Sequence, residues 1–291
     1  MKLQEIYSKT EKVISFEVFP PKEDSSKLIE EVENLSSFNP AFVSLTCGAG
    51  GRENKSFKII KEIEAVGLNV MPHFTCITSS KQSVEDGLKE LENQGIENIL
   101  ALRGDIPKDK SFICKDFCYA NELVKFIKEK TILSIGVAGY PEGHIESFDL
   151  KTDIENLKRK IDEGAEAIFT QLFFDNSKFY NYAEKVRSAG INIPIVCGIM
   201  PIISRKQVLK MTSLAKITVP KLINEKIEKY KNEANDLIDF GINQTCEQCE
   251  ELIKNGFKFL HFYTLNKSYS TIKILENIKE IKWTNILNIH Y

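Results

Sequence analysis

The sequence predicts a (β/α)8 TIM barrel formed by a single domain. Eight short apolar runs rich in β-branched and aromatic residues recur along the chain, and segments with helical periodicity lie between them. The runs are continuously apolar rather than alternating, as expected of strands in a parallel sheet covered by helices on both faces. Eight such units in 291 residues favour a closed barrel over an open sheet, because eight covered strands close most simply on themselves.

The first expected strand carries an unusual residue. It is read from VISFEVF, and Pro20 and Pro21 end it because proline cannot extend a hydrogen-bonded ladder. Glu17 lies inside this run, where an ionised carboxylate is costly unless it is paired. We therefore expect Glu17 either to have a partner or to have a raised pKa, and a carboxyl group that stays protonated near neutral pH is a general acid. In chain order, the eight expected strands are residues 13–19, 42–48, 69–76, 98–104, 132–140, 167–174, 193–200 and 259–265.

Amphipathic helices are expected between the strands. In residues 152–164, a Thr or Asp cap precedes Ile154, Leu157 and Ile161, which lie along one stripe of the helix. Comparable segments are residues 24–38, 83–95 and 180–190. Three of the four segments end on a glycine that comes just before the next strand, a common helix terminator: Gly95, Gly164 and Gly190.

The connection between the seventh and eighth strands is longer than the others. Residues 215–258 are strongly charged, and residues 221–241 show helical periodicity with no strand signal. We expect extra helices here, packed on the outside of the barrel. No Pro-, Gly- or Ser-rich linker divides the chain, so residues 1–291 are interpreted as one catalytic domain with a helical insertion at residues 215–258.

The composition of the chain argues against several classes of partner and site. The formal net charge is −2 with both signs interspersed, which gives no electrostatic reason to expect nucleic acid or an anionic membrane. No apolar run approaches the roughly 20 residues of a membrane span, and the first residues lack the apolar core of a signal peptide, so we expect a cytoplasmic protein. Seven irregularly spaced cysteines do not form a disulfide framework. Cys246 and Cys249 form one CxxC without a second ligand pair nearby, which favours two helix thiols over a metal site.

Polar residues gather at the ends of the expected strands, where barrel enzymes carry their catalytic groups. Individually they fit a solvated residue, a satisfied core histidine or an aromatic cap, but their concentration at one end of the sheet exceeds what packing requires. The residues are Glu17, Thr46, His73, Thr75, Arg103, Asp105, Tyr140, Glu142, His144, Gln171, Asp175, His261, Tyr263 and Asn266.

Several common site motifs are missing. The sequence has no GxGxxG after a strand, no GxxxxGK[ST], no GxSxG and no HExxH, which argues against a Rossmann cofactor site, a P-loop, a hydrolase elbow and a zincin. A phosphate-bearing cofactor would have to use loop amides, helix N-termini and side chains such as Arg159 and Lys160. Their charge pattern also fits a solvated helix face paired with acidic neighbours.

Eight motifs in series carry a resemblance to a known family. They are SFEVFPPK, FVSLTCGAGG, PHFTC, ALRGDIP, GYPEGH, DLKTDIENLKRKIDEGAEAIFTQLFFD, GIMPI and HFYTLN. From about residue 13 to residue 267 the chain resembles the catalytic domain of 5,10-methylenetetrahydrofolate reductase, the short bacterial type. The resemblance implies a flavoprotein that binds FAD, accepts hydride from NADH or NADPH, and reduces 5,10-methylenetetrahydrofolate to 5-methyltetrahydrofolate by a ping-pong mechanism in one-carbon and methionine metabolism.

The resemblance also implies roles for individual residues. Glu17 resembles the general acid that assists opening of the folate ring, Asp105 the aspartate beside the flavin, and Gln171 the glutamine that contacts folate and nicotinamide. The residues that resemble FAD contacts are Thr46, His73, Leu102, Arg103, Gly104, Asp105, Tyr140, His144, Asp153, Asn156, Arg159 and Lys160. The residues that resemble substrate contacts are Glu17, Gln171, Gln207, Tyr263 and Lys267.

Helical spacing supports part of this assignment, and alternatives stay open for the rest. Asp153, Asn156 and Lys160 share one side of a helix, as a ligand lying along it requires. One alternative is a barrel lyase or methyltransferase that acts on folate without flavin. Another is a folate-binding subunit of a larger electron-transfer complex, without NAD(P)H activity of its own. NADH, NADPH and a partner protein all remain possible donors, and we expect a homo-oligomer.

Overall fold

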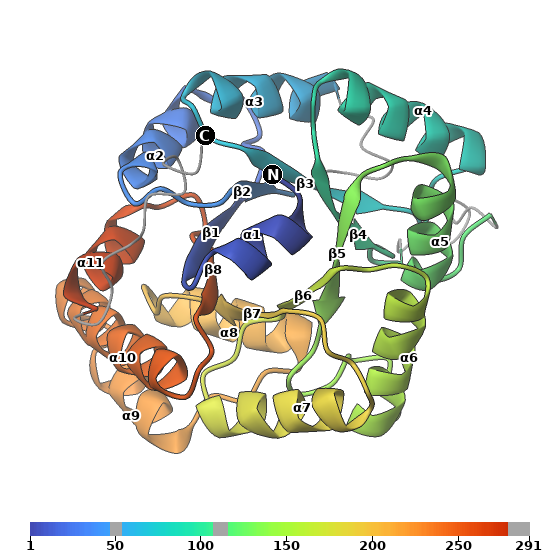
Figure 1. Cartoon of the computed structure of the whole chain (residues 1–291). Coiled ribbons are helices and arrows are strands. Elements are labelled where there is room, and N and C mark those ends of the chain that lie inside the picture. Colours follow the sequence, from blue (N-terminus) through green and yellow to red (C-terminus); the bar gives the residue numbers. More distant parts are fainter. Residues whose placement is uncertain (47–53, 107–115, 279–291) are drawn as a thin grey trace.

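A closed parallel barrel of eight strands forms the centre of the molecule (Figure 1). The computed structural model describes residues 1–46, 54–106 and 116–278. Each strand pairs with the next along the chain, and β8 closes the barrel against β1. The strands are β1 (Val13–Val18), β2 (Val43–Leu45), β3 (Val70–Thr75), β4 (Asn98–Leu102), β5 (Ser134–Gly139), β6 (Ala167–Thr170), β7 (Ile195–Ile199) and β8 (Phe259–Tyr263). The predicted fold class is confirmed, and every strand lies within its expected run.

The helices of the described residues mostly surround the barrel in Figure 1. They are α1 (Leu3–Lys9), α2 (Ser26–Ser36), α3 (Asn54–Ala65), α4 (Lys81–Asn93), α5 (Ala120–Lys130), α6 (Leu150–Asp162), α7 (Asn176–Ser188), α8 (Arg205–Ala215), α9 (Lys221–Lys229), α10 (Ala234–Lys254) and α11 (Tyr269–Asn277). No helix in these ranges is both long and apolar enough to cross a membrane.

The expected helix ends agree with the structure at the C-terminal side but differ at the N-terminal side, where α4 begins at Lys81 and α7 at Asn176 rather than at residues 83 and 180. Gly95, Gly164 and Gly190 follow α4, α6 and α7 with φ angles of 80°, 113° and 79°, a left-handed conformation that favours glycine. The expected Thr or Asp cap at the start of residues 152–164 is wrong. Asp149 caps α6 instead, because its side chain accepts a hydrogen bond from the backbone N–H of Thr152 at 2.7 Å.

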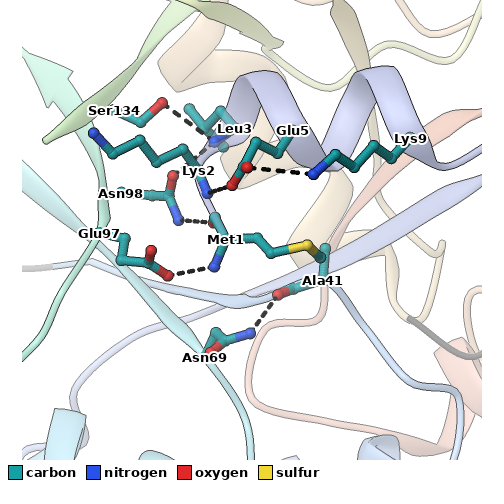
Figure 2. A network of polar contacts seen from close by, with 10 residues as sticks. All are labelled: Met1, Lys2, Leu3, Glu5, Lys9, Ala41, Asn69, Glu97, Asn98 and Ser134. Atoms are coloured by element: carbon teal, nitrogen blue, oxygen red, sulfur yellow. Dashed lines mark hydrogen bonds and ion pairs between the residues drawn. The ribbon is translucent and has the colours of Figure 1, made fainter. Parts of the chain in front are cut away.

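The short helix α1, which periodicity did not predict, covers the N-terminal end of the barrel. Leu3, Ile6 and Tyr7 point into the core at the helical spacing of three and four residues. The backbone N–H of Leu3 donates to Asn98 Oδ1 at 2.8 Å and to Ser134 Oγ at 3.2 Å (Figure 2). Because these two acceptors begin β4 and β5, α1 is fixed across the starts of the strands. The opposite end of the barrel is therefore the end available for a site.

Three helices connect β7 to β8. In Figure 1, α10 lies in the outer ring between α7 and α11, whereas α8 lies inside that ring. α8, α9 and α10 share one apolar cluster with residues that follow the ends of β6 and β7: Leu172, Phe174, Met200, Ile202, Val208, Ile217, Ile223, Ile227 and Leu237. α8 and α9 therefore pack beside the C-terminal ends of these strands.

Gly241 allows α10 to approach the segment that follows β7 closely. A Cβ atom at Gly241 would lie 1.8 Å from the carbonyl oxygen of Ile202, so a side chain larger than hydrogen does not fit. Cys246 and Cys249 lie on the same helix and are buried. Cys246 Sγ donates to the carbonyl of Ile274 in α11 at 3.7 Å, and burial raises its pKa to about 11. In this setting the two thiols contribute to packing.

Candidate active site

Two cavities meet at the C-terminal end of the barrel. The inner cavity, of about 170 Å³, lies in the barrel mouth, and the outer cavity, of about 370 Å³, extends from β4 and β5 toward α5 and α6. Leu102, Ala138 and Tyr140 line both. An elongated ligand held in the outer cavity can therefore reach the inner one past these three residues.

The inner cavity collects side chains from strands that are distant in sequence, because parallel strands of a barrel end at one rim. Its lining consists of Glu17, His73, Leu100, Leu102, Ala138, Tyr140, Phe169, Gln171, His261 and Tyr263. Six of the predicted site residues meet here: Glu17, His73, Leu102, Tyr140, Gln171 and Tyr263.

Glu17 lies between two histidines at the floor of this cavity. Its Oε2 is 3.4 Å from His73 Nε2 and 3.6 Å from His261 Nε2, and the carboxylate side chain is only 12% exposed. Burial alone would raise the pKa of Glu17, but the charges of both histidines and their polar contacts outweigh it and lower the pKa to about 2. Of the two outcomes expected from the sequence, the paired carboxylate is found. The expectation of a carboxyl kept protonated by burial is wrong for this arrangement.

Each histidine also contacts a serine, His261 through the ring nitrogen that points away from Glu17 and His73 through the same nitrogen that faces Glu17. Ser15 Oγ is 2.7 Å from His261 Nδ1, and Ser44 Oγ is 2.9 Å from His73 Nε2. The strand register explains the first contact, since Ser15 of β1 pairs with His261 of β8. The second follows from the register of β2 and β3, in which Ser44 pairs with Met71 and His73 lies two residues further on the same face. The register therefore builds a chain of polar groups in which protons can be held at the imidazole nitrogens.

The outer cavity combines cationic groups with a buried carboxylate. Lys160 Nζ donates to the carbonyl of Ala138 at 2.6 Å; burial lowers the pKa of this lysine to about 8, although Asp153 opposes the shift. Asp153 Oδ1 accepts from Ser147 Oγ at 2.9 Å, and burial raises the pKa of Asp153. The helix face predicted from Asp153, Asn156 and Lys160 lines this cavity.

Arg103 is oriented by a bidentate ion pair at the edge of the outer cavity. Its Nη1 and Nη2 atoms donate to the two carboxylate oxygens of Glu146 at 2.5 and 2.7 Å, and its Nε donates to the carbonyl of Gly104 at 3.2 Å. A guanidinium has five N–H donors, so two remain without an acceptor in the described part of the chain. Gly104 has a φ of 85°, and a Cβ there would lie 3.1 Å from Cβ of Thr75, so this turn favours glycine.

The structure places most predicted cofactor contacts around the outer cavity. They are Leu102, Arg103, Tyr140, His144, Asp153, Asn156, Arg159 and Lys160. Five predicted residues line neither cavity: Thr46, Gly104, Asp105, Gln207 and Lys267. Thr46 Oγ1 donates to the carbonyl of Val18, Gln207 contacts its own loop, and Asp105 and Lys267 are exposed. Their ligand contacts stay predictions.

Some lining residues were not among the predicted contacts. Tyr119, Ala120 and Asn121 at the start of α5 line the outer cavity, as do Glu146 and Ser147 from the β5–α6 loop. No motif distinguishes them in the sequence. Of the other polar residues noted at strand ends, Asp175 caps α7, and the side-chain amide of Asn266 exchanges two hydrogen bonds with the backbone of Phe19. Both therefore have structural roles.

Comparison with known families agrees with this arrangement of the site. The family model described as Methylenetetrahydrofolate reductase matches residues 2–279. The chain belongs to the methylenetetrahydrofolate reductase family. The resemblance carried by the eight motifs is confirmed, and the chain is an oxidoreductase of a family named for the reduction of methylenetetrahydrofolate.

Bacterial relatives of this family match over nearly their whole length. The chain is 36% identical over 269 residues to the 5,10-methylenetetrahydrofolate reductase of Salmonella typhimurium, which covers 91% of this chain and 90% of the relative. The enzyme of the same name from Escherichia coli is 35% identical with the same coverage. A rice relative, named probable methylenetetrahydrofolate reductase (NADH), is 36% identical, and this chain spans 51% of its length.

A solved structure shares the fold. An uncharacterized protein from Clostridium thermocellum, described as binding two copies of 5-methyl-5,6,7,8-tetrahydrofolic acid, superimposes with a TM-score of 0.66 at 12% identity, covering 97% of this chain and 99% of that one. At this identity the match shows the barrel fold alone. Across residues 1–46, 54–106 and 116–278, no group of three or more His, Cys, Asp or Glu side chains is placed to hold a metal ion.

Proposed function

We propose that this protein uses FAD and NADH or NADPH to reduce 5,10-methylenetetrahydrofolate to 5-methyltetrahydrofolate in the cytoplasm. The observation that carries the proposal is the pairing of Glu17 with two histidines in a small cavity that opens into a larger, cation-lined one. The first supplies acid–base groups, and the second suits an elongated anionic cofactor. The plant relative's printed name favours NADH as the donor.

The outer cavity fits the chemistry of FAD. The diphosphate of FAD requires cationic and N–H donors, and Arg103 has two N–H groups free of described acceptors while Arg159 and Lys160 line the same cavity. Asp153 and Asn156 provide acceptors for hydroxyl groups. When bound, FAD supplies the hydride chemistry, whereas the protein orients the cofactor and excludes water.

The proton required by the folate ring nitrogen is assigned to the Glu17 cluster. Because the pKa of Glu17 is lowered to about 2, its carboxyl group by itself is ionised at neutral pH, so the transferred proton has to be supplied to it by a neighbouring group. We propose that it is held at Nε2 of His73 or His261, both of which face Glu17 Oε2, and passes through Glu17 to the substrate. Glu17 is thus the proposed general acid, and a histidine supplies the proton that Glu17 passes on.

The size of the inner cavity supports ping-pong kinetics. About 170 Å³ leaves space for one substrate ring at a time, so nicotinamide and folate would have to use it in turn. Gln171 and Tyr263 line this cavity and are proposed to contact both substrates. Gln207 and Lys267, which lie outside it, are proposed to contact the part of folate that extends beyond the barrel mouth. Asp105 is proposed to adjust the flavin potential by its charge.

A visible spectrum tests the proposal. Purified protein supplied with FAD should be yellow, lose its flavin absorbance with anaerobic NADH or NADPH, and regain it when 5,10-methylenetetrahydrofolate is added. Protein that stays colourless with FAD would contradict the proposal and favour a flavin-free folate enzyme. Flavin and folate binding without oxidation of either nucleotide would favour a subunit of an electron-transfer complex. Light scattering tests the homo-oligomer, which stays a prediction.

A further inference from the structure

The β5–α6 loop, residues 140–149, contributes several residues to the lining of the proposed cofactor cavity. Tyr140 lines both cavities, and its ring centroid lies 4.7 Å from that of His144, which lines the outer one. The N–H of Gly143 donates to the carbonyl of Tyr140 at 2.9 Å, in a turn where Gly143 has a φ of 84°. The conformation of the loop is therefore tied to the residues that separate the two cavities.

Glu142 reaches from this loop to a different part of the molecule. Its Oε1 accepts a hydrogen bond from the backbone N–H of Thr218 at 3.0 Å. Thr218 follows Lys216, which ends α8 in the left-handed conformation with a φ of 50°. The contact joins positions 76 residues apart in the sequence, and it connects the loop beside the cofactor cavity to the C-terminal end of α8.

α8 depends on such contacts because it has little core of its own. Val208 is its one buried residue, whereas Leu209 and Leu214 are 46% and 62% exposed. The remaining polar contacts of α8 are local or lead to α9: Gln207 with Ile203 and Pro201, and Arg205 with Glu228. An element with few buried apolar contacts opens at low free-energy cost, so a single anchoring hydrogen bond has a measurable effect on its position.

We propose that Glu142 is a positioning residue that holds the C-terminal end of α8 against the β5–α6 loop. Through this contact, the loop that lines the cofactor cavity fixes the helix that carries Gln207 beside the barrel mouth. The reactant affected is the folate, whose extended part must pass α8, and this step of the inference rests on the proposed function. Glu142 lines neither cavity, whereas Tyr140, His144 and Ser147 of the same loop line the proposed cofactor cavity, so we expect the affinity for the cofactor not to depend on Glu142.

Two substitutions separate the hydrogen bond from the charge. Glu142→Ala removes the acceptor, whereas Glu142→Gln keeps a side-chain oxygen that accepts from Thr218. Glu155→Ala, an exposed residue of α6 paired with Lys151, is the matched control for loss of a surface carboxylate. Amide hydrogen exchange of residues 205–219 measures how firmly α8 and the segment after it are held. The Thr218 N–H, which donates the hydrogen bond to Glu142, lies in this segment.

Glu142→Ala is expected to raise exchange in residues 205–219 by about 3- to 10-fold, the effect of losing one hydrogen bond. It should raise the KM for 5,10-methylenetetrahydrofolate by a similar factor and leave kcat and the FAD dissociation constant within about twofold. Glu142→Gln and Glu155→Ala should behave like the wild type. Unchanged exchange in Glu142→Ala, equal change in the control, or faster exchange with an unchanged KM would each overturn the proposal. A wild type without folate reduction would instead overturn the proposed function, while the exchange data would still decide whether Glu142 holds α8.

Discussion

Glu17 Oε2 and His73 Nε2 lie 3.4 Å apart across the mouth of the barrel, on the first and third strands. The contact places an imidazole beside a carboxylate that is otherwise enclosed by apolar and aromatic walls. An isolated carboxylate in such a place would be neutralised by protonation. Here the histidines keep it ionised, so the carboxylate and imidazoles form one acid–base unit.

Replacing Glu17 with glutamine should separate the two half-reactions. Glu17→Gln is expected to bind FAD and to be reduced by NADH or NADPH at rates near those of the wild type, because neither step needs the proton. Folate reduction should fall by about 10²- to 10⁴-fold, the usual contribution of a general acid. Anaerobic stopped-flow absorbance of each half-reaction checks this. An equal loss in both halves would show that the role assigned to Glu17 is wrong.

The same residue should affect acid stability. A carboxyl whose folded pKa is lowered stabilises the fold above its unfolded pKa, and that contribution is lost as the pH falls through the folded value. For Glu17 the window runs from about 4.5 down to about 2, and the lowering corresponds to about 3 kcal/mol. Urea unfolding of the wild type and of Glu17→Gln should therefore differ most near pH 5 and converge toward pH 2. A difference that is constant over this range would contradict the pairing.

Asp105 tests the assignment of a charge beside the flavin. Asp105 is exposed just after β4. Burial is the main cause of the raised pKa of Tyr140, and the hydrogen bonds to Glu146 are the main cause of the raised pKa of Arg103; the charge of Asp105 makes a smaller contribution in the same direction to both. Asp105→Asn removes a negative charge and should raise the flavin midpoint potential, by on the order of 10 mV for an exposed group. Spectroelectrochemical titration measures the midpoint. No change would place Asp105 away from the ring.

A substitution at Gly241 should lower the stability of the fold without touching the active site. Gly241→Ala would press a methyl group against the carbonyl of Ile202, a backbone atom that cannot rotate away. The expected loss is about 1–3 kcal/mol, typical of overpacking, with a lower Tm in thermal unfolding. At an open position inside a helix, glycine to alanine would instead stabilise the fold by roughly 0.5–1 kcal/mol. A Tm equal to or above that of the wild type would therefore contradict the close approach of α10.

The sequence determined the strands more completely than the site. Continuous apolar runs and helix-ending glycines are local signals, and each coincided with an element of the barrel. α1 escaped prediction because seven residues are too few for a clear period, and its burial depends on Asn98 and Ser134, far along the chain. The pairing of Glu17 with two histidines could not be predicted from the sequence either, because His73 and His261 become its neighbours only when the barrel closes.

The closure of the N-terminal end of the barrel by α1 also affects the order in which ligands bind and leave. With Leu3, Ile6 and Tyr7 closing the N-terminal end, the barrel is a well with one opening, and everything that reaches Glu17 must enter and leave on the same side. A substrate and a product cannot pass through one opening in opposite directions at the same time. A bound product therefore has to leave the cavity before the next substrate can bind, so the closed end of the barrel enforces sequential binding and release.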